Sequence, residues 1–250
     1  MKPIQDIFPQ LPEPRKVVIT MHQKPDADAM GSTLALANFL KQLGHSVTVI
    51  SPTNWAKWLD WMPGANEVID YEAYKSKADA VLDATEWLFC LDFNIFHRTK
   101  SLGPKLKDIK CTKILIDHHQ EPDTPSFDYG ISDTGKSSTC EMIYDFIVGA
   151  GQQDRINETI SECIYAGVIS DTGSFRFPSA SANVHKLVSD LKSRGLVHSK
   201  VHERLFDNFL ENKLRFTGHV LLHRMDVMYE YNTVLIYIPK SDLLKFHVKT

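Results

Sequence analysis

The amino-acid sequence predicts an α/β fold: a doubly wound, mainly parallel sheet followed by the start of a second, smaller α/β domain. Two patterns lead to this prediction. Short, continuously apolar runs recur between residues 16 and 117, and such runs are typical of strands buried in a parallel sheet. Stretches with apolar residues at helical spacing alternate with these runs and follow them. Together the two patterns predict a sheet with helices packed against it.

The first strand, helix and second strand are expected between residues 16 and 50. Lys16–Met21 is a β-branched apolar run, which predicts a strand. Apolar residues at helical spacing over Ala29–Leu43 predict a helix. Gly44 suits the left-handed position that often ends a helix, and Ser46–Ile50 has the composition of the next strand.

Two more buried strands are expected at Trp87–Asp92 and Lys113–Asp117, because both runs are apolar throughout and too short for helices. Helical spacing then returns in the second half of the chain. Three helices are expected, at about Thr139–Val148, Asn157–Ile169 and Val184–Lys192.

The composition changes after Gly195, which suggests a domain boundary. A polar helical stretch, roughly Ser199–Phe216, precedes the strand-like alternation of Asp226–Pro239. The last region holds only about 35 residues, which is short for an independent domain, so it is interpreted as incomplete. The expected organisation is a first domain over residues 1–195, a connecting helix over 196–216 and the beginning of a second domain over 217–250.

Composition and charge exclude several classes of protein. The 250 residues are 43% hydrophobic and 24% charged, as in an ordinary globular protein. A net charge of -3 and a pI near 6.4 argue against a broad basic surface for long nucleic acid. The sequence has no signal-peptide core and no run of about 20 apolar residues, so we expect a cytoplasmic protein without a membrane partner. Four isolated cysteines are interpreted as buried, reduced thiols: Cys90, Cys111, Cys140 and Cys163.

Potential metal ligands gather where the first strand leads into the first helix. His22, Asp26 and Asp28 lie within seven residues, in a loop that Pro25 stiffens. An imidazole and two carboxylates there can converge on a hard divalent cation, and ligands of open α/β sheets bind at this edge. Taken singly, Asp28 could instead cap the helix and His22 could be an ordinary loop residue.

The next two strands end in the same chemistry. Asp92 closes its strand, and Asp117, His118 and His119 close the following one. Asp171 ends an apolar helical run and is followed by Thr172 and Gly173; alone it would be interpreted as a turn residue. Three strands that deliver such residues to one edge favour a shared site.

The order of these motifs resembles the DHH phosphoesterase superfamily. The motifs are H-x3-D-x-D-x2-G-S, an Asp after an apolar strand, Asp-His-His and Asp-Thr-Gly, and they cover about residues 15–195. Ser137–Glu141 and Asp171–Phe177 most resemble the NrnA type of oligoribonuclease and 3′-phosphoadenosine 5′-phosphate phosphatase. The resemblance makes the first domain a DHH catalytic domain and the last region the beginning of a DHHA1-like, substrate-binding domain. The glycine-rich Gly-Gly-His-like motif of such domains does not occur in the sequence.

The resemblance implies a site with two manganese ions, although the same ligands would accept Mg²⁺ or Co²⁺. Asp92 would bridge the two ions. Metals about 3.5 to 4 Å apart can hold a bridging hydroxide and contact phosphoryl oxygens at the same time. The implied ligands are His22, Asp26 and Asp92 for the first ion and Asp28, His118 and Asp171 for the second, with Asp92 shared.

The resemblance also implies catalytic roles for Asp92, His118 and His119. His119 would contact the substrate phosphate or the leaving group. The alternative is that it holds His118 or Asp117 in position without contacting the substrate. Asp117 is expected to orient its neighbours rather than to bind metal.

Four further residues are candidates for binding the substrate. Gly31 and Ser32 are expected to open the first helix, where free backbone N–H groups favour an anion, although simple helix initiation explains them equally well. Arg98 and Arg176 could each pair with a phosphate, or with a carboxylate elsewhere in the chain.

The implied function is a Mn²⁺-dependent phosphoesterase that hydrolyses short oligoribonucleotides and 3′-phosphoadenosine 5′-phosphate by two-metal hydroxide attack. A cyclic-dinucleotide phosphodiesterase and a pyrophosphatase-like hydrolase are the alternatives among enzymes. A nucleotide-binding sensor without turnover is the alternative from another class. The expected partners are short RNA oligonucleotides or small phosphorylated nucleotides, not long nucleic acid. The sequence leaves open whether the chain forms a homodimer.

Overall fold

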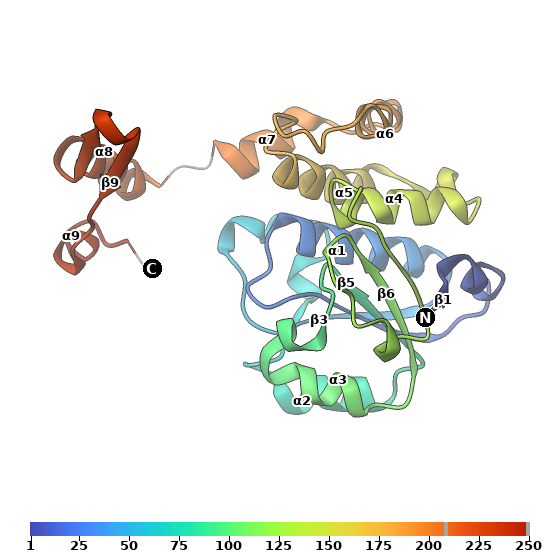
Figure 1. Cartoon of the computed structure of the whole chain (residues 1–250). Coiled ribbons are helices and arrows are strands. Elements are labelled where there is room, and N and C mark those ends of the chain that lie inside the picture. Colours follow the sequence, from blue (N-terminus) through green and yellow to red (C-terminus); the bar gives the residue numbers. More distant parts are fainter. Residues whose placement is uncertain (208–209, 249–250) are drawn as a thin grey trace. The chain divides into compact units, whose positions relative to one another are not determined.

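Seven parallel strands form the main sheet in a computed structural model that describes residues 1–207 and 210–248 (Figure 1). The strand order across the sheet is β1-β7-β6-β5-β2-β3-β4. The strands are β1 (Lys2–Pro3), β2 (Lys16–Thr20), β3 (Ser46–Ser51), β4 (Ile69–Asp70), β5 (Trp87–Leu91), β6 (Thr112–Asp117) and β7 (Tyr129–Ser132).

Helices cover both faces of this sheet, as a doubly wound fold requires (Figure 1). One face carries α1 (Ala27–Gln42), with α4 (Thr139–Gly149) and α5 (Glu158–Asp171) packed onto it. The opposite face carries α2 (Lys75–Asp83) and α3 (Gly103–Asp108). Two more helices follow α5: α6 (Ala182–Ser193) and α7 (His198–Phe206). Short 3₁₀ segments occupy Ile4–Gln10, Lys57–Leu59, Ala65–Glu67, Phe96–Leu102, Thr124–Ser126, Gln153–Arg155 and Tyr229–Tyr231.

The middle strands are apolar throughout because both of their faces are buried. In β2, Val17 and Ile19 pack into the core cluster that contains α1, whereas Val18 packs into the cluster that contains α2. The same alternation recurs in β5, where Phe89 and Leu88 face opposite clusters. This arrangement confirms the predicted parallel α/β sheet.

The predicted elements of the first 195 residues are confirmed, with ends that move by one or two residues. Gly44 has a φ of +89° after α1, in the left-handed region that the sequence predicted. The helices α2 and α3 and the strands β1, β4 and β7 were not predicted from the sequence. The strands β1 and β4 have two residues each, which is too short for a recognisable strand pattern. Helix α2 buries only Ala78 and Leu82, so its apolar residues do not form a recognisable helical pattern.

The chain divides into two compact units, Met1–Leu205 and Phe206–Thr250. The second contains α8 (Glu211–His223), β8 (Met225–Met228), β9 (Thr233–Ile236) and α9 (Lys240–Lys245), with β8 and β9 antiparallel. The single helix predicted over residues 196–216 is wrong. Extended backbone at Leu210 separates α7 from α8, and residues 208–209 of that prediction lie outside the described residues.

The predicted domain boundaries, and the predicted DHHA1-like character of residues 217–250, stay predictions; residues 249–250 lie outside the described part of the chain. Within the described ranges, no helix is long and apolar enough to cross a membrane. The four cysteines are free thiols, as predicted. Cys90, Cys140 and Cys163 are buried, but Cys111 is only partly buried, so its predicted burial is wrong.

Candidate metal centre

Three neighbouring strands deliver the predicted ligands to one edge of the sheet. β2, β5 and β6 lie side by side and parallel, so their carboxyl ends meet. His22 follows β2, Asp92 follows β5 directly, and His118 follows β6 directly.

Helix α1 contributes two carboxylates from its first turn. Asp26 is the N-cap: its Oδ1 accepts hydrogen bonds of 3.0 Å from the backbone N–H groups of Asp28 and Ala29. Its Oδ2 stays free of these bonds and lies 3.8 Å from Nε2 of His22. The sequence analysis offered Asp28 as the helix cap, and the structure gives that role to Asp26.

Asp28 is fully buried and faces the first turn of α4. Its Oδ2 accepts a hydrogen bond from the backbone N–H of Thr139 at 2.7 Å, and its Oδ1 accepts one from Cys140 at 2.9 Å. Free N–H groups at a helix start favour a negative charge, so α4 fixes this carboxylate. These contacts were not predicted from the sequence, although Ser137–Glu141 contributed to the resemblance.

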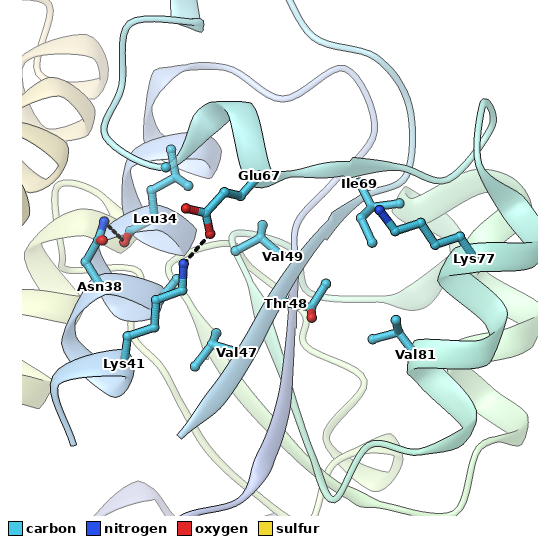
Figure 2. Close-up of a pocket in the computed structure, with 12 residues that line it drawn as sticks. Leu34, Asn38, Lys41, Val47, Thr48, Val49, Glu67, Ile69, Lys77 and Val81 are labelled. Atoms are coloured by element: carbon cyan, nitrogen blue, oxygen red, sulfur yellow. Dashed lines mark hydrogen bonds and ion pairs between the residues drawn. The ribbon is translucent and has the colours of Figure 1, made fainter. Parts of the chain in front are cut away.

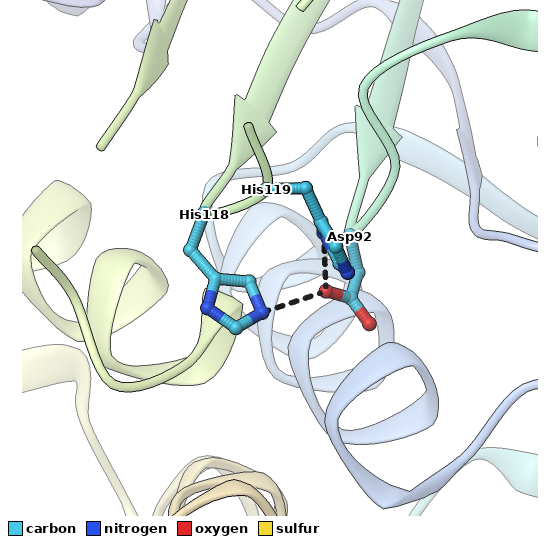
Figure 3. Close-up of side chains that lie close together, drawn as sticks. All are labelled: Asp92, His118 and His119. Atoms are coloured by element: carbon cyan, nitrogen blue, oxygen red, sulfur yellow. Dashed lines mark ion pairs between the residues drawn. The ribbon is translucent and has the colours of Figure 1, made fainter. Parts of the chain in front are cut away.

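Asp92 stands between His22 and His118. Figure 3 shows its contacts with His118 and His119. Its Oδ2 lies 3.3 Å from Nε2 of His22, and its Oδ1 lies 3.4 Å from Nε2 of His118. Oδ1 also accepts a hydrogen bond of 3.0 Å from the Thr139 hydroxyl. One buried carboxylate therefore faces two groups of possible ligands.

His118 links Asp92 to the last predicted ligand. Its Nε2 lies 3.5 Å from Oδ2 of Asp171, at the end of α5, and 3.9 Å from Oδ2 of Asp28. All six predicted ligands thus come together from five segments of the chain.

His119 is held by Asp117 rather than by the centre of the cluster. Its Nδ1 lies 2.7 Å from Oδ1 of Asp117, and its backbone N–H donates to Oδ2 of the same carboxylate at 3.2 Å. The side chain is about one third exposed, so Asp117 orients the ring while leaving Nε2 for another partner. Nδ1 also lies 3.7 Å from Asp92 (Figure 3).

Electrostatics in the cluster reflect its crowded carboxylates. Burial, with the charges of Asp92 and Asp171 added, raises the pKa of Asp28 well above its usual value. Burial and the charge of Asp92 also raise the pKa of Asp171 to about 7. Burial opposes ionisation of Asp92 too, but His118 and His22 hold the pKa of Asp92 below its usual range. Without a cation, these carboxylates are not all ionised at neutral pH.

The neighbouring carboxylates favour the charged, protonated form of His118. Burial alone would lower the pKa of His118, but the contacts with Asp92, Asp28 and Asp171 raise it to about 9. In the metal-free chain a proton on His118 therefore supplies part of the positive charge that the carboxylates require.

Backbone conformation and close packing also shape the site. Asp92 has a φ of +62°, in the left-handed region, which an aspartate tolerates better than most residues. Gly167 on α5 leaves room for Asp28: an added Cβ would meet Oδ1 of Asp28 at 2.5 Å and Sγ of Cys140 at 2.3 Å. The sequence analysis did not single out Gly167, because nothing local distinguishes it from another glycine in a helix.

The four predicted substrate residues are not gathered in the same way. Gly31 and Ser32 lie in the second turn of α1, not at its start, because the helix begins at Ala27; the expectation that they open the helix is wrong. Gly31 packs against α5, where a Cβ would meet the carbonyl oxygen of Cys163 at 2.5 Å, and the buried Ser32 hydroxyl donates to Ala29.

The two arginines differ in position. Arg98 lies beside the cluster, where its Nη1 is 3.4 Å from the carbonyl oxygen of Asp92. Arg176 is exposed in the loop after α5 and donates from Nε to the carbonyl oxygen of Gly173 at 2.6 Å. Of the two arginines, Arg98 contacts one of the six clustered residues, whereas the guanidinium of Arg176 bonds to Gly173 outside the cluster.

The donor atoms of the cluster suit divalent cations. Two groups of three have ligand atoms that all lie within 4.8 Å of one another: His22, Asp26 and Asp92, and Asp28, His118 and Asp171. A third group, of Asp92, His118 and His119, overlaps them. Carboxylate oxygens and imidazole nitrogens are ligands of Mn²⁺, Mg²⁺, Co²⁺ and Zn²⁺. A cation would offset the burial and the mutual repulsion that raise the pKa values of Asp28 and Asp171.

Comparison with known families agrees with this geometry. The model of the DHH family, N-terminal domain, matches residues 16–168, which include five of the six clustered residues. The chain belongs to the DHH family. The resemblance found in the sequence is therefore confirmed, and the family places the chain among metal-dependent phosphoesterases.

Curated relatives of this DHH chain carry one recurring name. This chain is 27% identical over 231 residues to the bifunctional oligoribonuclease and PAP phosphatase NrnA of Bacillus subtilis, and the match covers 92% of this chain and 68% of that protein. It is 26% identical to the probable NrnA of Streptococcus mutans, covering 70% of this chain and 51% of that protein. The chain thus spans from about half to two thirds of these relatives.

Two solved structures share the fold. An exopolyphosphatase-related protein from Bacteroides fragilis matches with a TM-score of 0.94 and 32% identity, covering 98% of this chain and 72% of that one. A putative family II inorganic pyrophosphatase from Methanococcus jannaschii matches with a TM-score of 0.52 and 15% identity, covering 92% and 75%. The second likeness concerns the fold alone.

Proposed function

We propose that this chain hydrolyses the phosphoester bonds of short oligoribonucleotides and of 3′-phosphoadenosine 5′-phosphate, with two manganese ions as cofactors. The position of Asp92 carries the proposal: its two oxygens face separate ligand groups, through His22 on one side and His118 on the other. The names of the NrnA relatives support the substrate class. The predicted cytoplasmic location stays a prediction.

The proposed ligands fall into two sets. His22, Asp26 and Asp92 would hold one ion, and Asp28, His118 and Asp171 would hold the other, with Asp92 shared. Two divalent ions would supply positive charge to the phosphoryl oxygens and acidify a water molecule. Thr139 and the first turn of α4 keep Asp92 and Asp28 in place for this purpose.

His119 is the proposed contact to the substrate. Asp117 accepts a hydrogen bond from the Nδ1 side of the ring, which leaves Nε2 to face the phosphate or the departing oxygen. Arg98 lies near enough to the cluster to add a second positive charge beside the phosphate.

Replacement of the shared carboxylate tests the proposal. We expect Asp92→Asn to lower kcat/KM by more than about a hundredfold on every substrate. Loss of a group that merely holds a metal ligand in position lowers activity by about 10- to 100-fold, and loss of the ligand itself should have a larger effect. The matched control is Asp108→Asn, an exposed residue at the end of α3, which should retain full activity. Circular dichroism of both variants checks the fold. An Asp92→Asn variant with normal Mn²⁺ stoichiometry and activity would refute the shared-ligand assignment.

A side-by-side assay separates the candidate substrates. We expect hydrolysis of a short oligoribonucleotide and of 3′-phosphoadenosine 5′-phosphate with Mn²⁺, and none after chelation until Mn²⁺ is restored. Faster turnover of cyclic di-AMP or pyrophosphate would favour the alternative hydrolases. Tight nucleotide binding without turnover, with two metals bound, would favour the sensor. Parallel assays with Mg²⁺ and Co²⁺ test the choice of metal.

A further inference from the structure

The outer edge of the main sheet is open along part of β3. β4 pairs with β3 only at Ile50 and Ser51. The earlier residues of β3, Ser46–Val49, have β2 on one side and no strand of the described residues on the other.

The hydrogen-bond alternation shows which backbone groups face this open side. The N–H of Ser46 donates to Arg15, toward β2, and the carbonyl oxygen of Ser51 accepts from Tyr71, on the β4 side. Residues of a strand alternate in direction, so the backbone groups of Val47 and Val49 face the same side as those of Ser51. The N–H and C=O of Val47 point away from β2 and lie beyond the end of β4.

A groove follows this edge (Figure 2). It consists of two adjoining cavities, of about 220 and 410 Å³, that share Thr48, Lys77 and Val81. Leu34, Asn38 and Lys41 of α1 form one wall, and Lys77 and Val81 of α2 form the other, with the β3 edge between them.

The two walls differ in chemistry. Leu34, Val47 and Val49 pack together in the main core cluster and give the α1 wall its apolar surface. Polar side chains line the rest of that wall, among them Lys41, which Glu67 neutralises at 2.5 Å. On the α2 side, Lys77 forms no ion pair with a described residue, although its neighbour Lys75 pairs with Asp79. Lys16 lines the second cavity and is likewise without an ion pair in the described part of the chain.

We propose that this groove binds an extended, acidic peptide segment of a partner protein as an additional strand. The free N–H and C=O of Val47 would supply the backbone hydrogen bonds. Alternate side chains of the peptide would face the apolar α1 wall and the uncompensated Lys77, which selects a pattern of alternating apolar and acidic residues.

Peptide binding to the 250-residue chain tests this proposal. The probes are fluorescein-labelled octapeptides in which valine alternates with glutamate, glutamine or lysine, followed by fluorescence anisotropy. We expect saturable binding of the glutamate peptide, at least about tenfold tighter than the glutamine peptide, and no binding of the lysine peptide. Failure of the glutamate peptide to bind, or equal binding of all three, would overturn the proposal.

Two variants test the contacts. Val47→Pro removes the N–H that faces the groove while sparing the hydrogen bonds to β2, and proline is tolerated on edge strands; we expect at least about tenfold weaker binding. Val47→Ile keeps the N–H and is the control. Lys77→Glu should transfer binding from the glutamate to the lysine peptide, whereas Lys186→Glu, an exposed lysine of α6, should not.

Folding and self-association are measured on the same samples. An unchanged Tm and phosphoesterase activity of each variant show that a loss of binding is local. If Val47→Pro binds the glutamate peptide as tightly as the original chain, strand addition is wrong. If sedimentation instead reveals a dimer that Val47→Pro dissociates, the edge serves a second copy and the peptide proposal is overturned.

Discussion

The side chain of Asp28 depends on a residue without a side chain. Gly167 lies against it, and the free space is too small for a methyl group. We expect Gly167→Ala to move Asp28 and to lower Mn²⁺ affinity and kcat/KM by about tenfold or more, which is the usual effect of losing a group that holds a metal ligand in position. Isothermal titration and steady-state kinetics measure both quantities.

The control for this replacement is Gly218→Ala, because an added Cβ there meets nothing within 4 Å and α8 has ordinary helical backbone. That variant should be neutral or slightly stabilising, since alanine favours helices over glycine by about 1 kcal/mol. Normal Mn²⁺ affinity in Gly167→Ala would show that α5 can shift without disturbing Asp28.

At this scale the sequence predicts the residues that carry charge but not those that place them. His22, Asp92 and His118 stand out because they end apolar strands. Thr139 donates to Asp92 from 47 positions away, and that contact depends on how α4 packs against α1. Gly31 was misplaced because the sequence did not show that Asp26, rather than Asp28, caps the helix, which begins at Ala27.

Helix α4 acts as an element that positions a charge. Its N-cap is Ser138, whose Oγ accepts the N–H of Glu141 at 3.0 Å, and its next two N–H groups bind Asp28. We expect Ser138→Ala to destabilise the chain by about 1 kcal/mol. It should also weaken Mn²⁺ binding, because the first turn of α4 loses its anchor beside Asp28.

A second helix provides the comparison. Ser181 caps α6 through Val184 in the same way, but it lies outside the cluster. Ser181→Ala should cost a similar free energy of unfolding, measured by urea denaturation, and leave Mn²⁺ affinity unchanged. Equal Mn²⁺ affinities in the two variants would mean that the cap of α4 serves stability alone.

Elements with long apolar patterns were predictable, and short or polar ones were not. β2, β5 and β6 are buried on both faces and appear as continuous runs, so the edge that holds the cluster followed from the sequence. α2 is mostly polar because one side of it faces solvent. The separation of α7 from α8 escaped detection because the polar helical pattern runs through the extended Leu210.

The whole molecule should respond to pH differently with and without metal. The pKa of His118 is raised to about 9 in the folded chain, so its stabilising contribution is complete below about pH 6.5 and is lost as pH rises through 9. Asp171, with a pKa of about 7, acts in the same direction at lower pH. We expect the Tm of the metal-free chain to fall between about pH 7 and 8.5.

Manganese should reverse this slope. Metal ions require deprotonated ligands, so the Tm gained on adding Mn²⁺ should grow over the same pH range. Scanning calorimetry of the chelated and Mn²⁺-loaded chain measures both slopes, and His118→Gln should flatten the decline of the metal-free form. A metal-free Tm that rises over this range would contradict the assigned proton on His118.

The cluster draws its side chains from residue 22 to residue 171, and the last of them sits at the end of α5, which packs along α1. Contacts between such remote segments close late, after the chain entropy of the intervening loop has been overcome. A cation can therefore be captured tightly only once nearly the whole sheet and its helices have condensed. In a stopped-flow refolding experiment, high-affinity Mn²⁺ binding should appear at the rate of the final folding step rather than at the rate of the initial collapse.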